Sequence, residues 1–337
     1  MAEKSVGEIV EMASAFYESA VLFAAITDGV FGAVERIKGG ATAGAVAKEL
    51  DASERGARLL LDACAALGLL AKEGEVYSNT QAGRMALVPG GSADLSKAIL
   101  YNRDVYPAWG RLADFAKTGR PVERPSIHLG DDAARTRTFA MSMRSRAMAI
   151  GRGVIPLLDL GGATRLLDLA GGPGAYAELI AKAFPSLGVV TVDLPAISAV
   201  AKECVAQAGL DGRIECRSGD YHSDEYESSA YDAVTIFGAL HQESPTDIVD
   251  ILGRAYRALR PGGKLYVLDM MTDATHTAPK FSALFAVNMA LTTENGWVFS
   301  DVELKGWMEK AGFEPGATRT LAPPMPHWLV EAVKPLA

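Results

Sequence analysis

A glycine-rich segment, Asp168-Leu-Ala-Gly-Gly-Pro-Gly174, constrains the fold of this chain more than any other feature of the sequence. It follows the apolar run Leu166–Leu169, which is typical of a buried strand, and precedes Ala175–Phe184, which has the pattern of a helix. Glycines let a ligand approach the backbone closely at a helix N-terminus. The spacing differs from the G-x-G-x-x-G fingerprint of dinucleotide-binding proteins. We predict a ligand-binding turn here, with a purely structural turn as the alternative.

Strands and helices alternate after the glycine segment. Such alternation builds βαβ units, in which parallel strands form one sheet covered by helices on both faces. The sequence therefore predicts an α/β fold, a doubly wound Rossmann-like sheet, over residues 156–337. Further strands are predicted at 188–193, 214–217, 231–236 and 264–269, with helices at 196–208 and 246–259.

Acidic residues stand where two of these strands end. Asp193 lies about twenty residues beyond the glycines, a position suited to accept hydrogen bonds from a ribose diol. Because Leu194-Pro195 follows, capping of the next helix is the alternative role for Asp193. A second motif, Gly219-Asp220-Tyr221, follows the strand at 214–217, and the turn Pro261-Gly262-Gly263 precedes the last predicted strand.

This order of motifs resembles the class I S-adenosylmethionine-dependent methyltransferases. The resemblance implies that the glycines pass under the methionyl part of the cofactor, that Asp193 holds its ribose and that Asp220 meets the adenine edge. The chain departs from the commonest form of the motif at Ala170, where glycine is frequent. The resemblance implies S-adenosylmethionine as the cofactor, S-adenosylhomocysteine as the product, and cofactor contacts from Asp168, Gly171, Gly172, Gly174, Asp193, Leu194, Gly219, Asp220, Tyr221 and Phe237.

Two later segments narrow the resemblance. Gly238-Ala-Leu-His241 and Phe285–Glu294 look like the hydroxyindole or acetylserotonin O-methyltransferase family, with its relatives acting on plant phenols and bacterial polyketides. In that family the histidine is the general base and the asparagine of an Asn-Met pair lines the acceptor site, which implies these roles for His241 and Asn288. The family usually carries Asp and Trp after the histidine, where this chain has Gln242-Glu243, and often an arginine at the position of Gly238.

His241 suits the removal of a proton from an acceptor hydroxyl. A phenol with a pKa of about 10 stays protonated at neutral pH, whereas an imidazole with a reference pKa of about 6.5 is free to accept its proton. The second ring nitrogen needs an acceptor that fixes the tautomer. Asp269, which ends the last predicted strand, is the first candidate and Glu294 the second. The alternatives are that His241 only begins a helix and that Asp269 bonds to nearby backbone.

Apolar side chains before the sheet and after Asp269 are available to wall an acceptor pocket. We expect fewer than half of them to contact the acceptor, because most such residues belong to the core. No spacing of His, Asp or Cys indicates a metal site, although a pairing of His222 with His241 stays open. The predicted acceptor-site residues are Met143, Phe285, Asn288, Met289 and Trp297.

The first 155 residues predict a second architecture. An apolar stretch, Val6 to about Ile37, is predicted to form a helix, and helices at 41–50 and 53–67 precede a hairpin at 69–77. This succession is typical of a winged helix. Residues 93–155 are predicted to be a helical linker and pocket-lining region, broken between Thr118 and Leu129. The resemblance implies that residues 1–92 are a winged-helix dimerisation domain, and we expect the apolar helix around Phe16 to pack across a homodimer interface.

Charge and composition exclude several functions. The net charge is −8, and the positive and negative charges of residues 1–155 are almost balanced. Neither part of the chain therefore has the excess of basic residues that would attract the phosphate backbone of a nucleic acid. The three cysteines form no CxxC pair, which indicates a reducing, cytoplasmic setting. We predict no membrane span and no signal peptide, because no apolar run nears the roughly 20 residues that a bilayer requires.

We therefore predict a homodimeric, cytoplasmic O-methyltransferase that acts on a hydroxyl of a small, aromatic molecule. Two alternatives stay open. Related enzymes on the same scaffold methylate carbon or catalyse other chemistry without methyl transfer. A winged-helix transcription regulator is the other alternative, but it requires a basic recognition surface that the balanced charge of residues 1–155 does not favour.

Overall fold

The computed structural model describes residues 3–123, 129–323 and 325–336. The chain divides into two compact units, Met1–Asp104 and Val105–Ala337, and the boundary falls inside the helix α7 (Ser96–Trp109). Because the sequence-predicted break at 118–129 overlaps 124–128, part of it lies outside the described residues. Each unit is built around its own buried core.

The first unit combines helices with a small antiparallel sheet. Its strands follow the order β1-β3-β2, and β2 and β3 form a hairpin closed by Gly74, which has a φ of 59°. The core is formed by buried side chains such as Phe31, Leu61 and Tyr77. The elements are α1 (Val6–Ser14), α2 (Phe16–Thr27), α3 (Val30–Arg36), β1 (Ala41–Thr42), α4 (Ala43–Glu49), α5 (Glu54–Ala66), β2 (Leu70–Glu73), β3 (Val76–Asn79) and α6 (Gln81–Ala86).

The predicted single helix from Val6 to Ile37 is three helices in the structure. A one-residue break at Ala15 separates α1 from α2, and Gly29, with a φ of 75°, separates α2 from α3. This left-handed conformation is one that glycine adopts at low cost, so Gly29 ends the α2 helix and redirects the chain.

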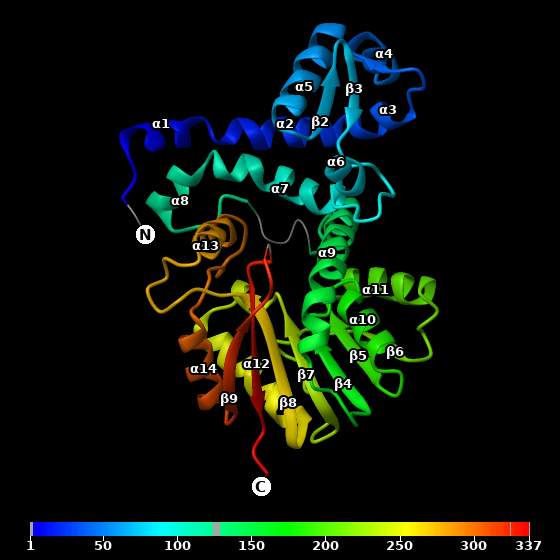
Figure 1. Cartoon of the computed structure of the whole chain (residues 1–337). Helices are drawn as coiled ribbons and strands as arrows, with labels where there is room; N and C mark the ends of the chain where they lie inside the picture. The colour runs from blue at the N-terminus through cyan, green and yellow to red at the C-terminus, as the bar shows by residue number, and fades with distance from the viewer. Residues whose placement is uncertain (1–2, 124–128, 324, 337) are drawn as a thin grey trace. The chain divides into compact units, whose positions relative to one another are not determined.

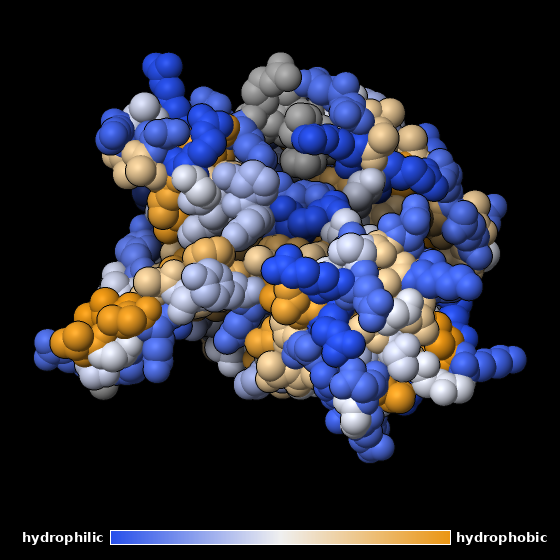
Figure 2. Space-filling model, turned by 90° about the horizontal axis from the view of Figure 1, so that it is seen from above, coloured by the Kyte–Doolittle hydropathy of each residue, from blue (hydrophilic) through white to orange (hydrophobic). Residues whose placement is uncertain are grey.

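The α1–α2 segment leaves large apolar side chains in solvent. Val6 and Val10 are 80% and 67% exposed, and Phe16 is 51% exposed. The prediction that no apolar segment approaches bilayer length was wrong, because Val6–Thr27 is long and apolar enough by length and composition alone, with a mean hydropathy of 1.5 over an 18-residue window. One such helix near an N-terminus is weak evidence for a membrane span. Figure 2 shows hydrophobic residues gathered at the left of the view, the side on which Figure 1 draws α1.

The described residues of the second unit form a seven-stranded sheet in the order β6-β5-β4-β7-β8-β10-β9. β6, β5, β4, β7 and β8 pair in parallel, and β10 and β9 add an antiparallel edge. The strands are β4 (Arg165–Leu169), β5 (Gly188–Asp193), β6 (Ile214–Ser218), β7 (Tyr231–Phe237), β8 (Leu259–Met270), β9 (Glu314–Thr320) and β10 (His327–Val333). The helices are α8 (Leu112–Thr118), α9 (Ala133–Val154), α10 (Ala175–Ala183), α11 (Pro195–Gln207), α12 (Pro245–Ala258), α13 (Lys280–Thr292) and α14 (Asp301–Lys310), with short 3-10 turns η2 (Ile155–Leu157) and η3 (Leu240–Gln242).

Alternate residues of the strands enter two different cores. In β4, Leu166 packs in the core shared with α10, whereas Leu167 and Leu169 pack in the core shared with α12 and α14. This alternation is the two-residue period of a strand that is buried on both faces. Figure 1 shows α12 and α14 on one face of the sheet and α9, α10 and α11 on the other. The Rossmann-like prediction is confirmed.

Two predictions about individual elements differ from the structure. The strand predicted at 264–269 is longer and begins at Leu259. Pro107, read as a minor break, lies inside α7, which ends two residues later. Proline removes one backbone donor, and near the end of a helix that loss affects few hydrogen bonds.

Candidate functional site

The sequence-predicted motifs meet at one edge of the sheet, where the parallel strands end. β4 leads into the glycine segment, β5 ends at Asp193, and β6 is followed by Asp220. β7 is followed by the η3 turn that carries His241, and Asp269 is the second-last residue of β8. In open α/β sheets ligands bind outside this carboxyl edge, so the topology places the predicted site where such a fold forms one.

The glycine segment packs too tightly for side chains. A Cβ atom at Gly171 would collide with Thr191 Oγ1 and with Asp168 Oδ2, and Gly172 and Gly174 have φ values of 57° and 73°. Ala170 also has a positive φ, 53°, so alanine occupies a left-handed conformation that glycine adopts more readily. At Gly172 an added Cβ would meet no atom within 4 Å, so the turn borders open space at this position.

Asp168 lies beneath this turn and is almost completely buried, with 1% exposure. Its two carboxylate oxygens accept hydrogen bonds from Thr191 Oγ1 (3.1 Å) and Thr235 Oγ1 (2.7 Å), residues that stand opposite Asp168 on the neighbouring strands. Burial raises the pKa of Asp168 to about 6, although both threonine hydroxyls favour the charged form. Asp168 therefore supports the glycine turn, and its predicted cofactor contact stays a prediction.

Asp193 binds both the glycine segment and the start of the next helix. Its Oδ2 accepts from the Gly172 amide at 2.7 Å, and its Oδ1 accepts from the Leu194 amide at 2.7 Å. Burial raises the pKa of Asp193 to about 6, against the lowering effect of the two amides. Each carboxylate oxygen keeps a lone pair that two hydroxyls of a diol could use. The local capping role and the ligand role are therefore compatible.

The loop after β6 is held by a cluster of polar side chains. Asp220 Oδ1 contacts His222 Nδ1 at 2.8 Å, and His222 Nε2 contacts Glu243 Oε2 at 2.8 Å. Tyr221 Oη donates to Glu243 Oε1 at 2.6 Å. Burial would raise the pKa of Asp220, but hydrogen bonds from the His222 amide and ring outweigh it, and the pKa is lowered. Gly219 begins the loop because a Cβ there would collide with Asp224.

His241 and Asp269 form a buried pair. His241 Nδ1 lies 2.6 Å from Asp269 Oδ1, and the backbone amide of His241 donates to Asp269 Oδ2 at 3.3 Å. Asp269 is fully buried, and its Oδ1 also accepts from the Met270 amide at 2.7 Å. Because an ionised carboxylate only accepts hydrogen bonds, Nδ1 carries the proton and Nε2 keeps its lone pair. Such a histidine can take a proton from a bound hydroxyl.

The second candidate partner, Glu294, is exposed, so Asp269 rather than Glu294 bonds to His241. Glu294 follows the end of α13, and its predicted catalytic role is not supported by this pairing. The sequence analysis named Asp269 as the first candidate partner of His241 and Glu294 as the second, and the structure shows Asp269 in this position.

The predicted acceptor-site residues come from two helices and one loop. Phe285 on α13 lies edge-on to the His241 ring, with 5.2 Å between ring centroids, and Met143 on α9 is partly buried. Asn288 is buried, and its Oδ1 accepts from Trp109 Nε1 at 2.9 Å, which leaves the amide nitrogen as a donor. Met289 is 4% exposed and belongs mainly to the core. These contacts place Phe285 beside the predicted base.

Trp297 bonds to the backbone around the predicted base, and its predicted contact with the acceptor stays a prediction. Its backbone amide donates to the His241 carbonyl at 2.9 Å, and its Nε1 donates to the Glu243 carbonyl at 2.9 Å. The ring packs beside Phe299 and Trp307. Phe237, predicted to contact the cofactor, is 6% exposed, and its ring lies edge-on to Tyr176.

The sequence analysis gave no role to Glu243 and considered His222 only as a metal partner of His241, whereas in the structure these two side chains contact each other. Glu243 is only 7% exposed and contacts side chains about twenty residues earlier in the chain. The available signal was the acidic residue two positions after His241, where the resembling family usually has tryptophan. Among the described residues no three His, Cys, Asp or Glu side chains are grouped as a metal ion would require.

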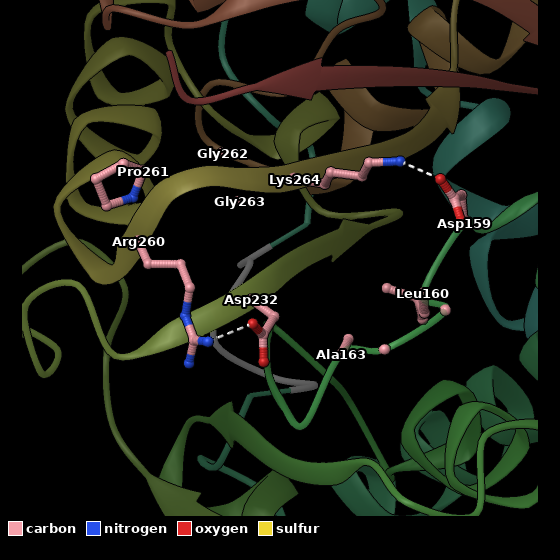
Figure 3. A pocket seen from close by; sticks show the side chains of 11 residues that line it. Asp159, Leu160, Ala163, Asp232, Arg260, Pro261, Gly262, Gly263 and Lys264 are labelled. Atoms are coloured by element: carbon pink, nitrogen blue, oxygen red, sulfur yellow. Dashed lines mark hydrogen bonds and ion pairs between the residues drawn. The ribbon is translucent and has the colours of Figure 1, made fainter. Parts of the chain in front are cut away.

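A pocket of about 250 Å³ lies at the opposite edge of the sheet (Figure 3). It is formed by the segment before β4, the start of β7 and the first part of β8. Its charged side chains are paired with each other, Lys264 with Asp159 and Arg260 with Asp232. The pocket therefore belongs to a different region from the strand-end cluster and offers no unpaired charge to a ligand from these four residues.

Comparisons with known proteins agree with this geometry. A family model described as an O-methyltransferase domain matches residues 119–314, and an O-methyltransferase dimerisation domain matches residues 10–89. A 3-hydroxy-5-methyl-1-naphthoate 3-O-methyltransferase of Streptomyces sahachiroi is 30% identical over 97% of this chain and 94% of its own length. Acetylserotonin O-methyltransferase of Bos taurus is 29% identical over 90% of this chain and 91% of its own. The crystal structure of human N-acetylserotonin methyltransferase in complex with SAM superposes with a TM-score of 0.88, 26% identity and 99% coverage of both chains.

Proposed function

The chain belongs to the O-methyltransferase family, and from this premise we propose that it methylates a hydroxyl group of a small aromatic molecule with His241 as the general base. It is an S-adenosylmethionine-dependent enzyme, as its family and similar structures are. The observation that carries the proposal is the buried His241–Asp269 pair, located at the same sheet edge as the glycine segment and Asp193.

The residues at the sheet edge fit S-adenosylmethionine. The glycine turn borders open space at Gly172, where an added Cβ would meet no atom within 4 Å, and we propose that the methionyl part of the cofactor lies there. Asp193 has lone pairs for the ribose hydroxyls, and Asp220 presents a carboxylate to the adenine edge. When bound, the cofactor supplies an electrophilic methyl group on a cationic sulfur. The carboxylates of the site favour a cation over a neutral ligand.

His241 removes the proton that an acceptor hydroxyl must lose. Asp269 fixes the imidazole with Nδ1 protonated and stabilises the positive charge that forms when Nε2 accepts the proton. The acceptor oxygen forms its new bond to the methyl carbon as the carbon–sulfur bond breaks, so positioning along this axis contributes much of the acceleration. Phe285 offers an edge to an aromatic ring beside His241, and the amide of Asn288 offers a donor.

The proposal is tested by incubating the purified protein with S-adenosylmethionine and a panel of phenols and hydroxylated polycyclic acids. We expect a mass gain of one methyl group on at least one aromatic hydroxyl, with stoichiometric S-adenosylhomocysteine. Nuclear magnetic resonance of the product distinguishes a methyl ether from a C-methyl group. A C-methylated product, or conversion without methyl transfer, would favour the alternative chemistries on this scaffold.

Replacement of Asp193 by alanine is expected to weaken S-adenosylmethionine binding by about tenfold to a hundredfold, because charged hydrogen bonds to the ribose and to Gly172 are lost. The pKa of Asp193 is about 6, so wild-type affinity should rise between pH 5 and pH 7 as the carboxylate ionises. Isothermal titration calorimetry measures both effects. Asp211→Ala, at an exposed position before β6, is the control. Equal affinities for the Asp193 variant and the wild type would contradict the ribose assignment.

We also propose that the chain is a homodimer assembled through α1 and α2. The dimerisation-domain match and the exposed apolar side chains of this segment support that arrangement. Sedimentation velocity is expected to give a dimer for the wild type and a monomer for Phe16→Asp, whereas Glu309→Lys on α14 should leave the dimer intact. An unchanged dimer in the Phe16 variant would place the interface elsewhere.

Further features of the first unit support a winged-helix assignment. The helices α3, α4 and α5 are followed by the β2–β3 hairpin, which β1 extends to three strands. We propose that this arrangement serves packing rather than DNA binding, and that residues 1–92, 93–155 and 156–337 are the dimerisation, pocket-lining and cofactor-binding parts. A mobility-shift assay with random duplex DNA should show no complex at physiological salt.

The free thiols of Cys64, Cys204 and Cys216 support a cytoplasmic location.

A further inference from the structure

Glu243 connects two parts of the site that are separate in the sequence. We name the cluster of Asp220, Tyr221, His222 and Glu243 the carboxylate clamp. Glu243 follows the predicted base by two residues, whereas the other three belong to the loop after β6. One Glu243 oxygen accepts from the Tyr221 hydroxyl at 2.6 Å and the other contacts His222 Nε2 at 2.8 Å. Both carboxylate oxygens of Glu243 are thus bonded to the loop after β6, which we call the cofactor loop.

His222 links Glu243 to Asp220. Its Nδ1 lies 2.8 Å from Asp220 Oδ1 and its Nε2 lies 2.8 Å from Glu243 Oε2, so the ring bridges two carboxylates. Only a protonated imidazole can donate from both nitrogens. The Tyr221 and His222 rings also lie close together, with 4.6 Å between their centroids. The clamp is therefore closed when His222 is charged and loses one hydrogen bond when it is neutral.

The Glu243 end of the clamp is held rigidly. Glu243 is 7% exposed, and Trp297 bonds to the backbone carbonyls of both His241 and Glu243 at 2.9 Å. A displacement of the Glu243 side chain therefore strains the same backbone segment that carries His241. His241 is in turn fixed by Asp269, which is fully buried.

We infer that Glu243 and His222 are positioning residues that fasten the cofactor loop to the segment carrying the base, so that adenosine binding and placement of His241 occur together. This inference rests on the proposed function, because it takes the loop at Asp220 as part of the cofactor site. Neither residue is required to touch the reacting atoms. Glu243 replaces the tryptophan usual in the family, so the fastening is a property of this chain rather than of the family motif.

The clamp should depend on pH. Burial would lower the pKa of His222, but its contacts with Glu243 and Asp220 outweigh that effect and raise the pKa. A raised pKa in the folded protein means that the contribution of the clamp is complete at low pH and is lost as the pH rises through that pKa. Nearby charges act in the same region: Asp224 accepts the Asp220 amide, and Arg254 on α12 bonds to the carbonyls of Ser223 and Asp224.

The test measures S-adenosylmethionine affinity by calorimetry at pH 7 and pH 9, together with KM and kcat, for the wild type, Glu243→Gln, His222→Gln and the double variant. We expect either single change to raise Kd and KM at pH 7 by about tenfold and to lower kcat by about threefold to tenfold, because His241 is then less well placed. The double variant should lose less than the sum of the two single effects, because both changes remove the same contact between Glu243 and His222. Wild-type Kd should rise between pH 7 and pH 9, and that of His222→Gln should not.

Controls separate a specific role from general damage. Tyr221→Phe removes one hydrogen bond but leaves the His222 bridge, so its pH dependence should match the wild type. Glu309→Gln on α14 should match the wild type in every measurement. If the wild type binds S-adenosylmethionine and Glu243→Gln binds it with the same affinity at both pH values, the inference that Glu243 positions the cofactor loop is wrong. If the wild type does not bind it at all, the proposed function itself fails.

Discussion

Replacing His241 with alanine is expected to lower kcat for a phenolic acceptor by about a thousandfold, which lies within the usual range for loss of a general base. The imidazole is oriented by Asp269 at 2.6 Å, so its other ring nitrogen has a defined direction. Alanine leaves the acceptor hydroxyl to lose its proton to water. Cofactor affinity should stay within about twofold of the wild-type value, because the glycine segment and Asp193 are separate from His241.

The acidity of the acceptor gives the sharpest measurement of this effect. A series of phenols with falling pKa should show a steep dependence of kcat in the alanine variant and a shallow one in the wild type, because an acidic phenol is already ionised at neutral pH. Single-turnover kinetics with saturating cofactor isolate the chemical step. Equal rates for the variant and the wild type on a weakly acidic phenol would assign catalysis to positioning alone.

Replacing Asp269 with asparagine is expected to lower kcat by about a hundredfold while leaving the protein folded. The amide can donate a hydrogen bond to Nδ1, which moves the proton to Nε2 and removes the lone pair that accepts from the substrate. Asp269 is fully buried, and its two oxygens accept the amides of His241 and Met270, so asparagine keeps the shape of the side chain but places its amide nitrogen against one of these donors, which should lower the thermal midpoint. The pH–rate profile and the thermal midpoint are measured together.

A matched control comes from the same sheet. Asp232→Asn changes a partly buried aspartate at the opposite edge, where it bonds to Thr164 and Arg260, and should reduce stability without changing kcat. If Asp269→Asn retains full kcat and the usual pH profile, the buried pair is structural and the tautomer argument fails. If the Asp232 variant loses kcat equally, the effect arises from loss of sheet stability rather than from the site.

The parallel half of the sheet and the strand-end residues could be predicted from sequence because both depend on local pattern. β5 spans the residues 188–193 that were predicted from its apolar run. The acidic residues at the strand ends lie along one edge of the sheet because parallel strands share their carboxyl edge. The choice of Asp269 as the partner of His241 followed from the same rule and agrees with the structure. The sheet topology therefore predicts which residues lie close together although they are far apart in the sequence.

Other features of the fold were not predicted from the sequence. β9 is an edge strand with mostly exposed residues, so it lacks the alternating apolar pattern that identifies a half-buried strand. The break at Gly29 was readable in principle, because glycine after Asp28 is a common helix terminator, but the continuous apolar run concealed it. The partners of Glu243 and Trp297 lie about twenty to fifty residues away across loops, where sequence spacing carries no information.

The proposed catalytic pair and the predicted acceptor-site side chains come from different elements, and this has an evolutionary consequence. His241 and Asp269 are fixed by the ends of β7 and β8, whereas Met143 and Phe285 project from α9 and α13. Substitutions on these helices can change which ring shape is accepted while proton transfer is inherited unchanged. After gene duplication, a chain built in this way can diversify its products by altering helix surfaces alone, which keeps each intermediate variant active during the divergence.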